Sequence, residues 1–233
     1  MCGRFVLITD LKIITESFHV RNVACEYRPG NNISPGQQIA AVLRKDDQNS
    51  LVNFRWGLIT SWAKDPSIGN KMINARAETV SEKPSFREAF KKRRCLIVAD
   101  GFYEWVRLDR KKKPYKFFLK SGQPFGFAGL YETWMSPEKE PINTCTIITT
   151  EPNELIQPIH DRMPVIVKKE LEGFWIDPDN HDQKELLAIL KPYSSEEMMM
   201  SPVDPSLLYV PKAQESAFFS SRTFNKVLSK LQE

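Results

Sequence analysis

The chain has 233 residues, of which 41% are hydrophobic and 27% are charged, as is ordinary for a soluble globular protein. Its longest apolar runs, such as Cys95–Ala99, are far too short to span a bilayer, and the opening residues lack a basic-then-apolar signal pattern. Because both a membrane span and a signal pattern are missing, we expect a cytoplasmic protein without a membrane partner. The formal net charge of +4 permits an anionic partner without requiring one.

Strand signals outnumber helix signals along the chain. β-branched and aromatic residues are enriched in Gln38–Leu43, Leu51–Trp56, Cys95–Ala99, Gly101–Leu108, Tyr115–Leu119, Phe125–Tyr131, Thr144–Thr149 and Pro164–Val167. Apolar residues recur at helical spacing in Asp10–Val20, Ser85–Arg93, Gln183–Leu190 and Thr223–Leu231, and the first of these helices is expected to have Thr9 or Asp10 as its cap. Because strands and helices do not alternate, a doubly wound parallel sheet is not expected. We predict a mostly antiparallel α+β fold, and the absence of a linker favours one monomeric domain over residues 1–233.

The cysteines show no CxxC spacing, so neither a zinc site nor a disulfide framework is expected, and no cofactor or metal is implied. Cys95 and Cys145 lie within apolar runs, which predicts core packing. Two basic runs, Lys91–Arg94 and Arg110–Lys113, are interpreted either as solvated loop tips or as a groove for a phosphate backbone. The methionines Met198–Met200 are interpreted as a core strand.

The chain opens Met1-Cys2-Gly3-Arg4-Phe5, and the small side chain of cysteine in second place permits removal of the initiator methionine. Cys2 would then carry a free α-amine and a thiol on adjacent carbons. The amine can attack an aldehyde to give an imine, and the thiol can then close a thiazolidine ring in an intramolecular step. With reference pKa values of about 8 and about 8.5, both groups titrate near neutrality. The pattern favours Cys2 as a nucleophile toward an aldehyde.

Three further segments carry polar groups within apolar or structured sequence: Ile73–Thr79, Ala99–Trp105 and Ile159–Pro164. Glu104 lies between aromatic residues in an expected strand, where the alternative is a side chain on the solvent face. His160 is one of three histidines, and a loop histidine is more often a surface residue. Together with Cys2, these segments supply a thiol, an amine, a carboxylate, an imidazole and an amide, which can form an acid–base set.

Six motifs occur in order between Met1 and Val167: MCGR, NNISPGQ, RWGLITSWAKD, NARAET, SFREAFKKRRCLIVADGFYEW and IHDRMPVIV. This pattern resembles the SRAP family, the SOS-response-associated peptidases or abasic-site processing proteins. The resemblance covers about the first three-quarters of the chain. It implies a strand-rich α+β domain with a basic cleft that binds single-stranded DNA containing abasic sites.

The resemblance also implies catalytic roles at matching positions. Cys2 would form the thiazolidine with the ring-opened sugar aldehyde, and Asn74 would hold the sugar or the Cys2 amine. Glu104 would orient the amine and shuttle protons, and His160 would protonate the sugar ring oxygen as the ring opens.

DNA-binding roles are implied for a second set of positions. Arginines would clamp the phosphates that flank the lesion, for which the planar guanidinium is suited. Trp62 would stack on a base or wedge beside it, and Asn32 and Pro35 would line the same cleft. The members of this set are Arg4, Asn32, Pro35, Trp62, Arg76 and Arg162.

Other interpretations stay open. The Schiff-base intermediate could undergo β-elimination, which would make the protein a lyase. A cysteine peptidase would need only the Cys2 thiol, activated by the N-terminal amine or by His160 as base, with Glu104 or Asn74 orienting that base. Autoproteolysis or release of the cross-link would be limited forms of that activity. A simple single-strand binding module would need only the basic residues and Trp62. Near the end, Tyr209–Glu215 departs from the family pattern, so no DNA contact is inferred there.

Overall fold

The structure is a computed structural model that describes residues 2–108 and 111–208. The helix expected at Thr223–Leu231, the atypical segment Tyr209–Glu215 and Arg110 of the second basic run lie outside the described residues. Within the described residues, no helix is long and apolar enough to cross a membrane.

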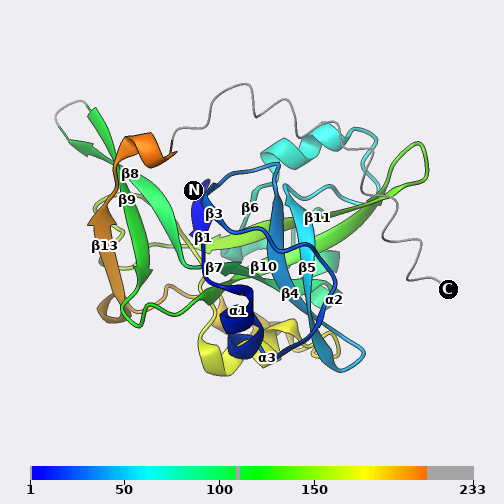
Figure 1. The fold of residues 1–233 in the computed structure, drawn as a ribbon. Helices are drawn as coiled ribbons and strands as arrows, with labels where there is room; N and C mark the ends of the chain where they lie inside the picture. Colours follow the sequence, from blue (N-terminus) through cyan, green and yellow to red (C-terminus); the bar gives the residue numbers. More distant parts are fainter. Residues whose placement is uncertain (1, 109–110, 209–233) are drawn as a thin grey trace.

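The first sheet runs along one side of the molecule (Figure 1). Within the described residues it has five strands, in the order β13 (Met198–Pro202), β9 (Lys111–Leu119), β8 (Gly101–Leu108), β1 (Phe5–Leu7) and β3 (Gly30–Ile33). All of its pairings are antiparallel. Strand β1 lies in this sheet near the centre of the molecule, and it follows the N-terminal end of the chain (Figure 1).

The second sheet has eight strands in the described part of the chain. Its path is β12 (Met163–Pro164), β11 (Pro141–Thr150), β10 (Phe125–Met135), β7 (Arg94–Ala99), β4 (Gln38–Lys45), β5 (Gln48–Trp56) and β2 (Val20–Val23), with β6 (Asn74–Arg76) paired to β11. Strand β11 also pairs with the end of β5, and this contact closes β11, β10, β7, β4 and β5 into a ring. Strand β6 is parallel to β11 and pairs with it just beyond the residues of β11 that pair with β5.

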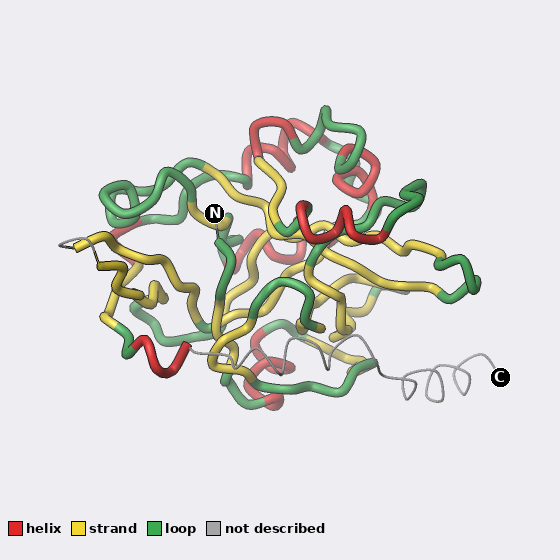
Figure 2. Tube along the Cα trace, turned by 90° about the horizontal axis from the view of Figure 1, so that it is seen from above, coloured by secondary structure: helices red, strands yellow, loops and turns green. Residues whose placement is uncertain are grey.

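The helices are short and lie around the strands (Figure 2). They are α1 (Leu11–Ser17), α2 (Arg87–Lys92), α3 (Glu172–Ile176) and α4 (Gln183–Ile189), with 3-10 turns at η1 (Pro66–Lys71), η2 (Ala77–Thr79), η3 (Lys169–Leu171), η4 (Ser195–Glu197) and η5 (Pro205–Leu208). Helix α1 begins at the predicted Asp10 cap, whose carboxylate accepts a 2.8 Å hydrogen bond from the Lys12 amide.

One hydrophobic core joins the two sheets. The ring of Phe5 in β1 contacts Trp56 of β5 at 5.3 Å and Phe127 of β10 at 6.0 Å between centroids. Phe102 of β8 contacts the same Phe127 at 6.1 Å. Such aromatic contacts stabilise a core beyond the effect of burial alone. They also fix β1, which begins three residues after Cys2, and β8, which carries Glu104, against the ring of strands.

The prediction of a strand-rich, mostly antiparallel α+β fold is confirmed, with parallel pairing confined to β2–β5, β5–β11 and β6–β11 among the described strands. Of the predicted strand Pro164–Val167, only Pro164 belongs to β12, which pairs with β11. Further along the segment, Ile166 forms an isolated bridge to Phe127 of β10. The sequence signals missed β1, β2, β3 and β6, which have only three or four residues each. The predicted methionine strand exists, but Met199 and Met200 are exposed and only Met198 is buried.

The basic run Lys91–Arg94 fits neither of its two interpretations as a whole. Lys91 and Lys92 end α2, and Arg93 forms a 2.8 Å ion pair with Glu132. Arg94 is buried, and its guanidinium donates hydrogen bonds to backbone carbonyls of α2 and of the segment after α3. A buried guanidinium needs such acceptors because it cannot lose its charge. Arg94 is therefore a structural residue and does not face a phosphate backbone.

Candidate functional site

Cys2 lies at the start of the chain segment that becomes β1. It is fully buried, and its backbone carbonyl accepts a 3.0 Å hydrogen bond from the side-chain amide of Asn74 in β6. The other side-chain atom of Asn74, Oδ1, is buried and has no hydrogen-bond partner within the described residues. An unsatisfied buried acceptor is costly, so this oxygen is available to a group that enters the site.

Glu104 reaches the same place from β8. Strand β8 pairs with β1 so that Phe102 faces Phe5, and the Tyr103 amide continues the ladder by donating to the Arg4 carbonyl at 2.9 Å. Glu104 is only 6% exposed, so the interpretation that it lies on the solvent face is wrong. Its charge acts on the Cys2 thiol, which brings the carboxylate and the sulfur into one electrostatic environment.

Burial is the largest influence on the pKa of the Cys2 thiol and on that of the Glu104 carboxyl group. It raises the pKa of the Cys2 thiol well above its ordinary value, and the negative charge of Glu104 raises it further. Burial also raises the pKa of Glu104 to about 7, against the lowering effect of the positive amino terminus. The thiol is therefore protonated at neutral pH, while the carboxyl group is near half-protonated and can both accept and return a proton.

His160 lies in the loop before β12 and is half-buried. Its Nδ1 atom accepts a 2.9 Å hydrogen bond from the backbone N–H of Arg162 and lies 2.9 Å from a carboxylate oxygen of Asp161. Burial lowers the pKa of His160, and the positive amino terminus lowers it further.

Arg162 links the histidine loop to the segment after Asn74. Its guanidinium forms two hydrogen bonds, of 2.6 and 2.9 Å, with the carboxylate of Glu78 in η2. It also donates a 2.6 Å hydrogen bond to the backbone carbonyl of Thr149 in β11. This bidentate pair fixes the plane of the guanidinium. Neither Glu78 nor Asp161 was singled out from the sequence, because a surface acidic residue carries no signal until its partner is known.

The remaining predicted DNA contacts differ in their surroundings. Arg4 donates a 2.9 Å hydrogen bond to the side chain of Asn32, which itself donates to the Leu208 carbonyl at 2.8 Å. Pro35 lies in the turn between β3 and β4 and is half-buried. Arg76 is exposed at the end of β6, two residues beyond Asn74. Trp62 has 63% of its surface exposed, which is unusual for so large an apolar side chain.

The chain was compared with known families and proteins. The family model described as SOS response associated peptidase (SRAP) matches residues 1–209. The chain belongs to the SRAP family. The match includes every residue of the site around Cys2, and it continues past the motif-bearing part that ends at Val167.

Individual SRAP relatives agree with this assignment. The chain is 51% identical to the abasic site processing protein YoqW of Bacillus subtilis, over 91% of this chain and 96% of the relative. It is 32% identical to the abasic site processing protein HMCES of Xenopus tropicalis, over 72% of this chain and 59% of the relative. A crystal structure of a Bacteroides thetaiotaomicron protein is similar with a TM-score of 0.80 and 26% identity, covering 89% of this chain and 98% of that one.

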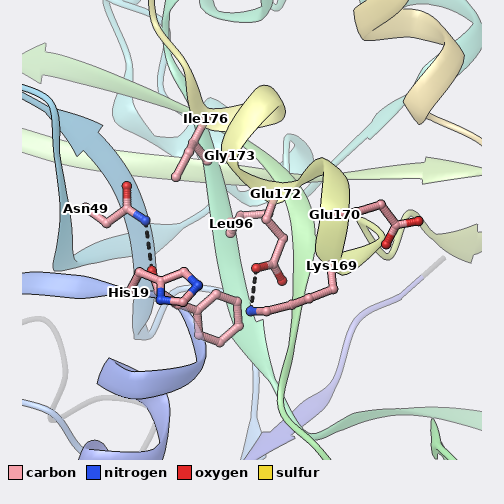
Figure 3. A pocket seen from close by; sticks show the side chains of 9 residues that line it. His19, Asn49, Leu96, Lys169, Glu170, Glu172, Gly173 and Ile176 are labelled. Atoms are coloured by element: carbon pink, nitrogen blue, oxygen red, sulfur yellow. Dashed lines mark hydrogen bonds and ion pairs between the residues drawn. The ribbon is translucent and has the colours of Figure 1, made fainter.

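This SRAP chain also has a cavity of about 380 Å³ between α1 and α3, lined by none of the predicted site residues. In Figure 3, the Lys169 ammonium and the Glu172 carboxylate point toward each other inside it, and the ion pair measures 2.7 Å. Lys169 also donates to the Ser17 carbonyl and lies 4.6 Å from the Phe18 ring centroid. These contacts tie α3 to the end of α1, so the cavity has a structural explanation separate from the site around Cys2.

Proposed function

We propose that this protein processes abasic sites in single-stranded DNA by forming a covalent thiazolidine between Cys2, once Met1 has been removed, and the ring-opened sugar. The observation that carries the proposal is the buried meeting point of Cys2, Asn74 and Glu104, which come from the segment before β1, from β6 and from β8. The relatives named abasic site processing proteins support the same substrate.

The chemistry uses both functional groups of an N-terminal cysteine. The α-amine adds to the C1′ aldehyde of the opened sugar, and water leaves as the imine forms. The thiol sulfur then adds to the imine carbon, and its proton ends on the ring nitrogen. One C–N bond and one C–S bond form, one water molecule is released, and nothing is oxidised or reduced. The ring closure is intramolecular, so it has a large effective concentration.

Each of the residues around Cys2 has a role in these reaction steps. Glu104, with a pKa raised to about 7, takes a proton from the α-amine and returns one to the leaving water. The Asn74 amide holds the Cys2 backbone, and its buried Oδ1 can accept a hydrogen bond from the amine or from a sugar hydroxyl. His160 protonates the sugar ring oxygen as the ring opens.

The DNA would lie in a cleft around this site. The exposed Arg76, together with Arg4 and Arg162, would contact the phosphates that flank the lesion, while Asn32 and Pro35 line the cleft. The exposed ring of Trp62 would stack on a base, as aromatic residues do in single-strand binders. The proposal requires no metal, no cofactor and no partner subunit, and it places the reaction in the cytoplasm or on the nucleoid of a bacterial cell.

The same imine can partition toward β-elimination, which would give a lyase activity alongside the stable adduct. A peptidase that attacks with the Cys2 thiol is the second candidate, and autoproteolysis or cross-link reversal belongs to it. That candidate needs a thiolate, whereas burial raises the thiol pKa and keeps it protonated. The buried, protonated thiol instead suits addition to an imine that has already formed next to it.

Mass spectrometry of the purified protein tests the proposal. The intact mass should show that Met1 is absent, and incubation with an abasic single-stranded oligonucleotide should add the oligonucleotide mass less one water. Cys2→Ser should retain the imine route but lose the heat-stable adduct. Cys25→Ser is the matched control because Cys25 is a free thiol outside the site. Undiminished heat-stable cross-links in Cys2→Ser would overturn the thiazolidine, and cleavage of peptide substrates without any DNA adduct would favour the peptidase.

A further inference from the structure

The Nδ1 atom of His160 has two neighbours that make opposite demands. The Arg162 backbone N–H, 2.9 Å away, needs an Nδ1 lone pair to accept its hydrogen bond. The Asp161 carboxylate oxygen, also 2.9 Å away, needs a proton on the same nitrogen. A single nitrogen cannot meet both demands at once. Each neighbour therefore matches a different protonation state of the imidazole.

We propose that Asp161 is a positioning residue that makes His160 a two-state proton donor for abasic-site processing. In the neutral state, Nδ1 accepts from the Arg162 amide and the proton of the ring is held on Nε2. In the charged state, Nδ1–H donates to Asp161 and Nε2–H keeps its direction. Transfer of the Nε2 proton to the sugar ring oxygen leaves a neutral ring with its remaining proton on Nδ1, held by Asp161, and proton exchange with solvent then restores the Nε2–H tautomer. The consequence for catalysis rests on the proposed function, whereas the tautomer and the ion pair do not.

The surrounding charges explain why such a residue is needed. Burial, the amino terminus and the Arg162 guanidinium all disfavour the imidazolium, and Asp161 is the opposing charge beside the ring. Glu104 of β8 is the other carboxyl group of the site, and the charge of Asp161 helps to raise its pKa. Glu78 of η2 neutralises the Arg162 guanidinium from the far side. Removing the Asp161 charge should therefore leave His160 a weaker base.

The loop geometry is held independently of Asp161. The Arg162 guanidinium is fixed by Glu78 and by the Thr149 carbonyl, and the His160 amide donates to the Ile156 carbonyl at 3.0 Å. The Asp161 side chain itself is 87% exposed. Asp161→Asn is therefore expected to preserve the fold and the neutral tautomer while removing the charge. Because the carboxylate is exposed, its effect should weaken as salt is added.

NMR on the full, Met1-processed chain labelled with ¹⁵N-histidine tests this inference without DNA, with His160→Gln used to assign the signals among the three histidines. Wild-type His160 should show an unprotonated Nδ1 in its neutral form. Asp161→Asn should lower the His160 pKa by about half a unit to one unit at low salt and by less at high salt. Asp161→Glu should restore part of the shift, and Asp46→Asn, in the distant β4–β5 turn, should cause none.

The functional arm measures the initial rate of cross-linking to abasic single-stranded DNA against pH. Asp161→Asn should slow the reaction about three- to tenfold at pH 7 to 8 and recover toward the wild-type rate near pH 5 to 6, in line with the lower His160 pKa. An unchanged His160 pKa in Asp161→Asn, or an Nδ1–H neutral tautomer in the wild type, would overturn the inference. If wild-type protein forms no adduct while the pKa shift is present, the proposed function fails and the inference about Asp161 stands.

Discussion

The Asn74 side chain donates a 3.0 Å hydrogen bond to the backbone carbonyl of Cys2, across 72 residues of sequence. This bond holds the first described residue of the chain against β6, whose own position is fixed by parallel pairing with β11. A chain terminus is ordinarily poorly ordered unless something ties it down. Asn74 thus gives Cys2, the proposed nucleophile, a defined position.

Asn74→Ala tests this role directly. The variant should lose about 1 kcal/mol or less of folding stability, the usual contribution of one hydrogen bond. Its cross-linking rate should fall by about ten- to a hundredfold, because a reaction between positioned groups is sensitive to small displacements. Asn53→Ala is the matched control, since Asn53 makes a similar side-chain bond of 3.1 Å to the Glu26 carbonyl outside the site. Equal rates in the two variants would contradict a positioning role.

Glu104→Gln should separate stability from activity. The folded-state pKa of Glu104 is about 7 against an ordinary 4.5, so the folded protein binds this proton more tightly than the unfolded chain. Stability should fall as pH rises from about 4.5 to about 7 and then remain at the lower level. Removing the buried charge should therefore stabilise the protein at pH 8, by about 2–3 kcal/mol. Cross-linking should nevertheless be lost.

Glu172→Gln is the control for that experiment. Glu172 is a second buried carboxylate, and burial raises its pKa to about 6 despite the ion pair with Lys169. It lines the cavity between α1 and α3, away from the predicted site residues. Glu172→Gln should flatten the dependence of melting temperature on pH between about 4.5 and 6 while cross-linking continues. Loss of activity in both variants would remove the distinction that assigns a chemical role to Glu104.

In the proposed function, Glu78 and a DNA phosphate would compete for the Arg162 guanidinium. Because Arg162 already has a bidentate carboxylate partner, DNA must displace Glu78 or share Arg162 with it. Glu78→Gln should therefore bind single-stranded DNA about three- to tenfold more tightly at low salt, with a steeper salt dependence by about one phosphate contact. Fluorescence anisotropy at several salt concentrations measures both quantities. Weaker binding in Glu78→Gln would mean that Glu78 serves to orient Arg162 instead.

Trp62→Ala should affect DNA binding without affecting the fold. With 63% of its surface exposed, Trp62 contributes little to the core, and the change in unfolding free energy should stay within about 0.5 kcal/mol. Loss of base stacking should weaken single-strand affinity by about 1–3 kcal/mol, or about five- to a hundredfold in Kd. Met135→Ala, which removes another exposed apolar side chain, should leave the affinity unchanged. A similar loss in both variants would argue against stacking by Trp62.

The site was only partly predictable. The sequence placed Cys2, Asn74, Glu104 and His160 in one set, but it left Glu104 open to a solvent-facing interpretation. Alternation along β8 cannot decide which face is buried; the pairing of β8 with β1 and the core beneath them decide it. For Arg94 the sequence suggested a solvated or phosphate-binding residue, but the residue is buried. Its burial depends on carbonyl acceptors in α2 and α3, which only the fold brings together.

By itself, the sequence determined the chemical groups and the local elements. A thiol next to a potential free amine, the long strands of the ring and the Asp10 cap all follow from residue type and short-range spacing. Tertiary structure decided the environments: the burial of Cys2, the raised pKa of Glu104, the two partners of His160 Nδ1 and the pairing of Arg162 with Glu78. Solvation and electrostatics depend on neighbours in space. For Cys2 and Arg4 these neighbours lie in β6 and β8, 72 and 99 residues further along the chain. Cys2 therefore carries reactive groups by sequence, and it acquires its protonation state and its position only from the fold.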